Sequence, residues 1–205
     1  MEKNEEQLSH RQSLGIIEQM IAAAKNEHRE KGDGWLIWGW LLFIASTSSV
    51  VCMLLQKREL VGWIWTGMLV IGFALGFFIS IIRKRKAKVT TYIQELLQKL
   101  GAGFFISLFV MIASSYITKS YYAFGYYYIL YAFWMYIHGS AIRFRPLIIG
   151  AVINWLAAIL IFFSNDNFLY IMIISSIAIL GGYLIPGYML RNQFKKSNQL
   201  KGVSY

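Results

Sequence analysis

The strict separation of charge from apolar sequence is the strongest constraint on this fold. Lys and Arg number 20 and Asp and Glu number 10, and all of them lie outside six long apolar stretches, at 35–55, 61–82, 101–118, 121–139, 147–163 and 168–190. Each stretch approaches the ~20 residues that a helix needs to cross the ~30 Å hydrocarbon core of a bilayer. Because charge is costly at the bilayer centre, we predict an all-α polytopic membrane protein with six transmembrane helices in one bundle.

Composition agrees with this prediction and leaves little chain for a separate domain. Hydrophobic residues make up 57% of the chain and charged residues 15%, whereas soluble domains have about 25% charged residues. The remaining segments are an arm at 1–34, a basic linker at 83–100 and a basic tail at 191–205. The arm is polar, so we expect no cleavable signal peptide. A single cysteine, Cys52, excludes an intramolecular disulfide, and we expect no cofactor and no metal.

The distribution of basic residues predicts the orientation. If the N-terminus is cytoplasmic, seventeen Lys and Arg lie in cytoplasmic segments, and only Lys57, Arg58 and Lys119 lie outside. Short cytoplasmic loops carry an excess of Lys and Arg. We therefore expect both termini in the cytoplasm. The outer segments would be only 56–60, 119–120 and 164–167, which are too short to fold into a receptor domain.

The N-terminal arm has the pattern of a narrow amphipathic helix. Its apolar stripe follows alternating spacings of three and four residues: Leu14, Ile17, Ile21, Ala24 and His28. The helix could lie on the bilayer, pack on the bundle, or pair with another protein. The arm has more acidic than basic residues, unlike helices that bind anionic lipid, which favours packing or pairing. Gly32-Asp33-Gly34 predicts a hinge before the first span.

The basic residues predict contact with anionic lipid headgroups at the cytoplasmic face. The candidates are Arg83, Lys84, Arg85, Lys86 and Lys88 in the linker, and Arg143 and Arg145 before the fifth span. In the competing interpretation, these residues serve only as topological anchors. Nucleic acid is not an expected partner, because these residues lie where membrane topology already requires them.

The spans hold no Asp, Glu, Lys or Arg. Pumps and voltage sensors need ionisable groups at membrane depth, and aspartyl or zinc intramembrane proteases need carboxylates or an HExxH motif. These classes are therefore disfavoured, and we predict no catalytic residues. His138 lies at the inner end of its span, where an interfacial histidine is the expected interpretation.

Small and polar residues within the spans predict helix contacts. Gly72, Gly76 and Ser80 form a GxxxG-type face for close helix packing. Gly181, Gly182, Pro186 and Gly187 make the sixth span the one most inclined to kink. A candidate intramembrane polar cluster combines Tyr128, Tyr131, His138 and Asn154. Asn154 and Tyr131 lie at similar depths in neighbouring spans, so we expect Asn154 to face the interior and to bond to Tyr131. The face of the fourth span beside them would either line a cavity or pack in the ordinary way.

Several segments carry a resemblance to a known family. They are Ser13-Leu14-Gly15-Ile16-Ile17 with Met20-Ile21, Trp35-Leu36-Ile37-Trp38-Gly39-Trp40, the basic run ending near Thr91-Tyr92, and Phe144-Arg145-Pro146-Leu147 with Gly150 and Trp155. Together they resemble a family of small, uncharacterised bacterial multi-span membrane proteins, over nearly the whole chain. The resemblance implies the bacterial inner membrane. It also implies a signalling link, because genes of that family often lie beside one for a winged-helix transcriptional regulator.

Three functional hypotheses follow from the sequence. The preferred one is a non-enzymatic regulatory or scaffolding component that acts through its cytoplasmic face, with membrane lipids and a protein at the arm as partners. The alternative is a carrier or binder of a small apolar molecule or lipid. The third is a lipid-modifying enzyme. A dry, packed bundle with a projecting arm favours the first hypothesis, and a solvent-connected polar cavity favours the second.

Overall fold

The computed structural model describes residues 32–84, 92–118 and 121–199, and within these ranges the secondary structure is entirely helical. The all-helical prediction is confirmed for this part of the chain. The helices are α2 (Asp33–Leu54), α3 (Glu59–Lys84), α4 (Tyr92–Thr118), α5 (Ala123–Ala141), α6 (Arg145–Phe162), α7 (Phe168–Ile179), the π-helical turn η1 (Leu180–Leu184) and α8 (Ile185–Gln199). The predicted arm helix falls on residues 1–31, outside the described ranges.

Five helical stretches are long and apolar enough to cross a membrane: α2, α3, α4, α6, and the continuous run of α7, η1 and α8. The sixth predicted stretch is also helical. It forms α5, a helix of 19 residues with no Asp, Glu, Lys or Arg. Five tyrosines lie in α5, and this helix is not among the five stretches that are long and apolar enough to cross.

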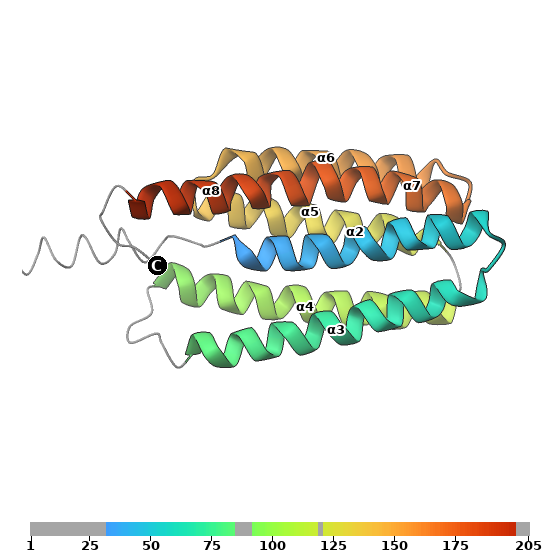
Figure 1. The fold of residues 1–205 in the computed structure, drawn as a ribbon, viewed down its shortest axis with the longest axis horizontal. Helices are drawn as coiled ribbons and strands as arrows, with labels where there is room; N and C mark the ends of the chain where they lie inside the picture. The colour runs from blue at the N-terminus through green and yellow to red at the C-terminus, as the bar shows by residue number, and fades with distance from the viewer. Residues whose placement is uncertain (1–31, 85–91, 119–120, 200–205) are drawn as a thin grey trace, which may run out of the picture. The chain divides into compact units, whose positions relative to one another are not determined.

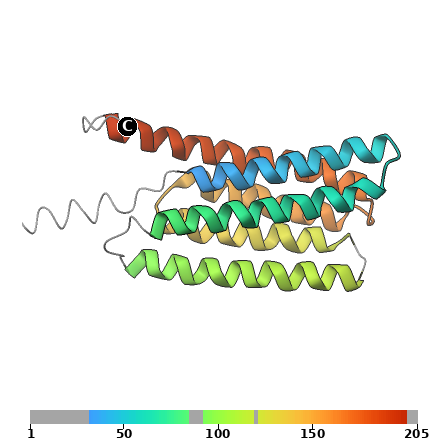
Figure 2. The ribbon, with the colours of Figure 1, turned by 60° about the horizontal axis from the view of Figure 1, so that its bottom comes forward.

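The described helices lie side by side along a common direction (Figure 1). The most extensive contact is between α5 and α6, which are joined by a short turn at 142–144. Helix α2 packs on α7 and η1, while α3 packs on α2 and α4 packs on α5. The α3 and α4 helices lie together along one edge of the bundle in Figure 1, and α4 lies along one edge in Figure 2. Only 11% of the apolar window of each is buried, against 50% for Phe168–Lys196.

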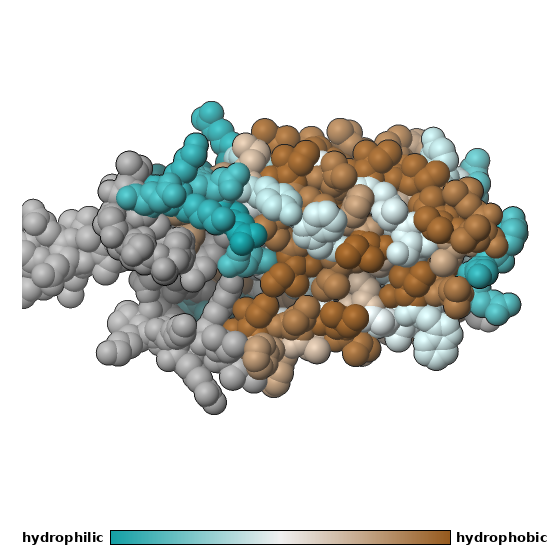
Figure 3. Space-filling view, in the orientation of Figure 1, coloured by the Kyte–Doolittle hydropathy of each residue, from teal (hydrophilic) through white to brown (hydrophobic). Residues whose placement is uncertain are grey.

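Polarity is segregated along the helix direction. In Figure 3, hydrophobic residues form a broad band over the middle of the visible face, and hydrophilic residues gather towards its two ends. Large apolar side chains such as Phe77, Phe109 and Ile177 are 70%, 67% and 69% exposed. Such extensive apolar exposure is expected where lipid, rather than water, surrounds a bundle.

A glycine sets the backbone conformation at the start of α2. Gly32 has a φ of 74°, a left-handed conformation that glycine adopts without steric cost. A Cβ at this position would lie 3.1 Å from the Arg191 backbone nitrogen and from the Gly187 carbonyl oxygen of α8. Next to it, Asp33 Oδ1 lies 3.7 Å from Arg191 Nε. Helix α2 therefore begins directly after Gly32, within the segment 32–34 where a hinge is predicted, and Gly32 lies close to α8.

The predicted irregularity of the sixth span takes the form of a π-helical turn. Pro186 lacks a backbone N–H, and a proline ring clashes with the carbonyl four residues earlier, here that of Gly182. Widening the helix by one residue per turn relieves this clash. Accordingly, the Ile185 N–H donates to the Leu180 carbonyl, five residues back. The turn is buried at Gly182, Tyr183 and Leu184.

The predicted GxxxG-type face on α3 does not bring two backbones together. Gly72 is buried, but it accommodates the Trp38 indole of α2, whose nearest atoms would lie 2.8 Å from an added Cβ. Gly76 has no heavy atom within 4 Å of such a Cβ, and the Ser80 side chain is outside the described part. At the two described positions of this face, Gly72 therefore meets a side chain and Gly76 meets no heavy atom within 4 Å of an added Cβ.

Candidate functional site

Two buried serines of α2 form hydrogen bonds inside the bundle. Ser46, fully buried, donates to the Met172 carbonyl of α7 at 2.8 Å and lies 2.9 Å from Ser176 Oγ. Ser49, also fully buried, donates to the Ala45 carbonyl of its own helix at 2.7 Å and accepts from Trp65 Nε1 of α3 at 3.1 Å. The first serine therefore joins α2 to α7, and the second joins α2 to α3.

Asn154 faces the interior, as predicted, with no exposed surface. Its predicted partner is wrong. Asn154 Nδ2 donates to the Gly150 carbonyl of its own helix at 2.7 Å and lies 3.4 Å from the Met135 sulfur of α5. Tyr131 instead packs its ring on Phe104 of α4 and Tyr183 of η1. The two residues lie at similar depth on adjacent helices, but their side chains point to different neighbours.

One close helix crossing, between α6 and η1, was not revealed by the sequence pattern. A Cβ added to Gly150 of α6 would overlap the Gly182 carbonyl oxygen, and one added to Gly182 would overlap Asn154 Nδ2. The Gly150 carbonyl oxygen also lies 3.1 Å from the Cβ position of Gly182. Each glycine thus presents a Cα–H to the other's carbonyl, a weak hydrogen bond typical of close helix contacts. In the sequence these two glycines lie 32 residues apart and form no known packing motif, so their spacing did not indicate the contact.

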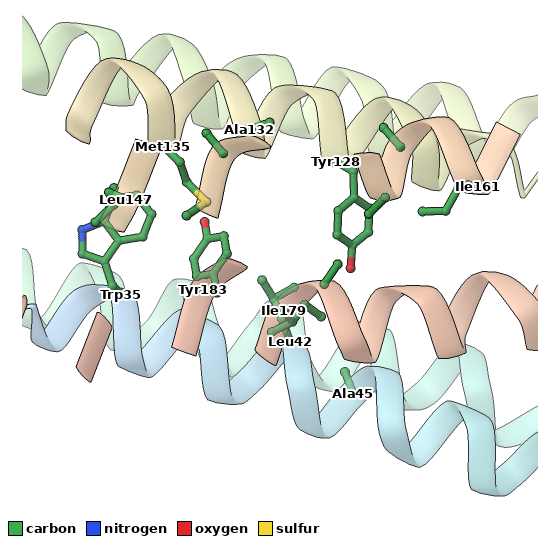
Figure 4. Close-up of a cluster of buried hydrophobic side chains, with 14 of the residues drawn as sticks. Trp35, Leu42, Ala45, Tyr128, Ala132, Met135, Leu147, Ile161, Ile179 and Tyr183 are labelled. Carbon is green, nitrogen blue, oxygen red and sulfur yellow. The ribbon is translucent and has the colours of Figure 1, made fainter. Parts of the chain in front are cut away.

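The three deep tyrosines of α5 differ in their hydrogen bonds. Tyr127 lies 2.7 Å from Ser115 Oγ of α4. Tyr128, only 4% exposed, donates to the Ser175 carbonyl of α7 at 3.2 Å, and Figure 4 shows its hydroxyl pointing toward that helix. For Tyr131, no hydrogen bond is found within the described ranges. The first two tyrosines therefore have hydrogen-bond partners on neighbouring helices.

Six aromatic rings form a closed circuit that includes two of the predicted site residues, Tyr131 and His138. Successive ring centroids lie 5.3–6.1 Å apart, in the order Trp35, Tyr183, Tyr131, Phe104, Trp134 and His138, and the last ring returns to the first at 5.3 Å. The rings come from α2, η1, α5 and α4. Helices α2 and α5 are thus joined through side chains rather than through close backbones. Edge-to-face and tilted aromatic pairs of this kind each add about 0.5–1.5 kcal/mol beyond their buried area.

The predicted lipid-contacting residues divide into three groups. Arg143 and Arg145 are exposed in and after the turn between α5 and α6, and Arg143 has a φ of 53°. Arg83 and Lys84 end α3, but the structure does not describe their side chains. Arg85, Lys86 and Lys88 lie outside the described residues. Within the described ranges, no group of His, Cys, Asp and Glu is arranged to hold a metal ion.

No protein-family model, curated protein or solved structure matches this chain. The functional argument therefore depends on the residues and their geometry.

Proposed function

We propose that this chain is an integral membrane protein that crosses the bilayer six times, with α5 as the sixth crossing. At about 1.5 Å per residue, the 19 residues of α5 extend about 28 Å, close to the ~30 Å core. Helix α5 packs on α6, and a short turn reverses the chain between them. Because α6 is long and apolar enough to cross, its antiparallel neighbour crosses beside it.

The orientation proposed is cytoplasmic for both termini, in a bacterial inner membrane. Arg143, Arg145 and Arg191 are exposed at the proposed inner end, and Lys57 and Arg58 at the outer end. The total of seventeen inner against three outer basic residues supports this choice.

Reporter fusions test the orientation. Fusions after Arg58, Ser120 and Asn165 should report the outer side, and fusions after Lys88 and Lys196 the inner side. Fusion after Ser120 is the critical one, because it separates α4 from α5. An inner-side report at that position, or an outer-side report after Lys88, would contradict the six-span topology.

Within the membrane, we infer a non-enzymatic regulatory or scaffolding component that acts through its cytoplasmic face. The observation that supports this function is how the buried polar side chains are used. The Ser46, Ser49 and Tyr128 hydroxyls bond helices to one another, so these buried polar groups hold the bundle together. The proposed partners are anionic lipid headgroups at the basic linker and a protein at the N-terminal arm. The family resemblance, with its neighbouring winged-helix regulator, is consistent with a signalling role.

Affinity capture from native membranes tests this proposal. In one variant, Leu14, Ile17 and Ile21 of the apolar stripe are replaced by serine. In the matched control, Glu18 and Gln19 of the polar side are replaced by serine. A protein partner should be captured by the wild type and by the control, and lost from the stripe variant. Equal capture by all three chains would contradict a partner at the arm.

The alternative function, a carrier or binder of a small apolar molecule or lipid, has one observation in its favour. Asn154 Oδ1 is buried and has no hydrogen-bond partner in the described part of the chain. Identification of the lipids and small molecules that co-purify with the same captured protein distinguishes the two functions. A stoichiometric small molecule that is lost from an Asn154→Leu variant would favour the carrier.

A further inference from the structure

Two exposed arginines flank the buried end of the turn that joins α5 to α6. Arg143 lies in the turn and Arg145 begins α6, and within the described ranges neither has an ion-pair partner. Between them, Phe144 is buried, and its N–H donates to the Gly139 carbonyl at 2.8 Å. The buried phenylalanine therefore anchors the turn, and the anchored turn keeps both arginines at the surface.

The acidic side chains at the proposed inner end are already paired with other basic residues. Among the described residues these acids are Asp33, whose carboxylate lies 3.7 Å from Arg191, and Glu95, whose carboxylate lies 2.7 Å from Lys99. The first turn of α6 has no acidic residue and begins with Arg145, although the N-terminus of a helix favours negative charge. The described part of the chain therefore leaves the positive charge of this turn unbalanced, and an anion is the partner that fits it.

An exposed apolar stripe continues from Arg145 along α6. Spacings of four, three and four residues lie on one face of a helix, and from Arg145 they lead to Ile149, Val152 and Leu156, all of which are exposed. At 1.5 Å per residue, the stripe reaches about 16 Å from Arg145, which is about half of the ~30 Å hydrocarbon core. A basic group followed by an apolar stripe of this length matches one phospholipid of a single leaflet.

We propose that the α5–α6 turn and this stripe bind one anionic phospholipid of the inner leaflet. Arg143 and Arg145 donate to its phosphate, since guanidinium groups bind phosphate oxygens with strong, charge-assisted hydrogen bonds, and an acyl chain lies along the stripe. A zwitterionic headgroup carries an ammonium group that the two arginines repel, so the net charge of the headgroup decides selectivity. The inference rests on the proposed orientation of α5 and α6, and it uses residues other than those of the basic linker.

Native mass spectrometry of the purified full chain in detergent tests this assignment, with phosphatidylglycerol as the anionic probe and phosphatidylethanolamine as the zwitterionic one. The wild type should bind one phosphatidylglycerol more tightly than phosphatidylethanolamine. Arg143→Gln combined with Arg145→Gln should weaken phosphatidylglycerol binding about 30-fold, because each basic residue contributes about 1 kcal/mol. The matched control combines Lys57→Gln with Arg58→Gln. It removes the same charge from exposed positions at the opposite end and should leave the affinity unchanged.

A further variant separates this site from the basic linker. Lys84→Gln combined with Lys86→Gln removes two charges from the linker and should leave the binding of phosphatidylglycerol intact. Loss of binding in this variant alone would overturn the site at the turn, while the lipid partner proposed for the linker would stand. Equal binding of the two lipids, equal loss in the turn and outer-end variants, or displacement of the lipid by inorganic phosphate at the same concentration would also overturn it. The reporter fusions test the orientation independently of lipid binding.

Discussion

Substitution of Gly150 by alanine should destabilise the bundle, because the added methyl group meets backbone rather than a movable side chain. The ideal Cβ overlaps the Gly182 carbonyl oxygen and lies 2.8 Å from Met135 Cε. The Met135 methyl group can rotate away. The Gly182 carbonyl cannot, since it belongs to the π-helical turn, so α6 and that turn must separate.

The expected magnitude comes from comparison with two other glycines. Inserting a methyl group into a packed core costs about 1–3 kcal/mol, whereas replacing glycine by alanine within a helix gains about 0.5–1 kcal/mol. At Gly103 nothing lies within 4 Å of the added Cβ, and at Gly181 the nearest atom is 3.7 Å away. The variants Gly103→Ala and Gly181→Ala should therefore show only the stability gained by replacing glycine with alanine in a helix. Because the propensity gain is common to all three positions, the difference between Gly150→Ala and either control should be about 1–3 kcal/mol.

The assay is the free energy of unfolding of the purified protein in mixed detergent micelles, measured by denaturant titration. Each variant is compared with the wild type under one set of conditions. If Gly150→Ala proved as stable as Gly103→Ala and Gly181→Ala, the close crossing of α6 with η1 would be refuted. The argument that Pro186 drives the Gly182 carbonyl toward α6 would fail with it.

Two further substitutions test the hydrogen bonds between helices with the same assay. Ser46→Ala removes a buried interhelical hydrogen bond and should lower the free energy of unfolding by about 0.6–2 kcal/mol, while Thr47→Ala, at an exposed position of the same helix, should leave it unchanged. Tyr128→Phe removes the hydrogen bond to the Ser175 carbonyl and should cost about 0.6–1.7 kcal/mol. Tyr126→Phe, at a residue 55% exposed, should cost nothing measurable, and equal losses in the two tyrosine variants would contradict the assigned role of Tyr128.

The fold class could be predicted from the sequence because membrane insertion depends on properties that can be read directly along the chain. Apolar length and the position of charge decide which segments form helices. A helix runs through most of each predicted stretch, and several helices extend beyond these stretches. Helix α4, for example, begins at Tyr92 in the predicted linker, and α8 continues to Gln199 in the predicted tail. Polar sequence can continue a helix outside the apolar region, so hydropathy alone places such boundaries poorly.

The contacts inside the bundle could be predicted only in part. Burial of Asn154 followed from sequence, because an amide facing lipid would be too costly. Its partner did not follow, since matched depth leaves the rotation of each helix open. Each residue turns the side-chain direction by about 100°. The interior face of α5 presents Met135 to Asn154, while Tyr131 points toward α4 and η1.

The sequence by itself determined that this chain is helical and suited to a membrane, and where its charges lie. The tertiary structure decided which small residues bring helices together. Gly72 and Gly76 have the familiar spacing but lie on an edge helix, whereas Gly150 and Gly182 share no motif and bring two backbones close together. The physical reason is that a glycine matters for packing only where another backbone approaches it. That approach depends on how Pro186 reshapes the last span and on which faces the other helices leave open.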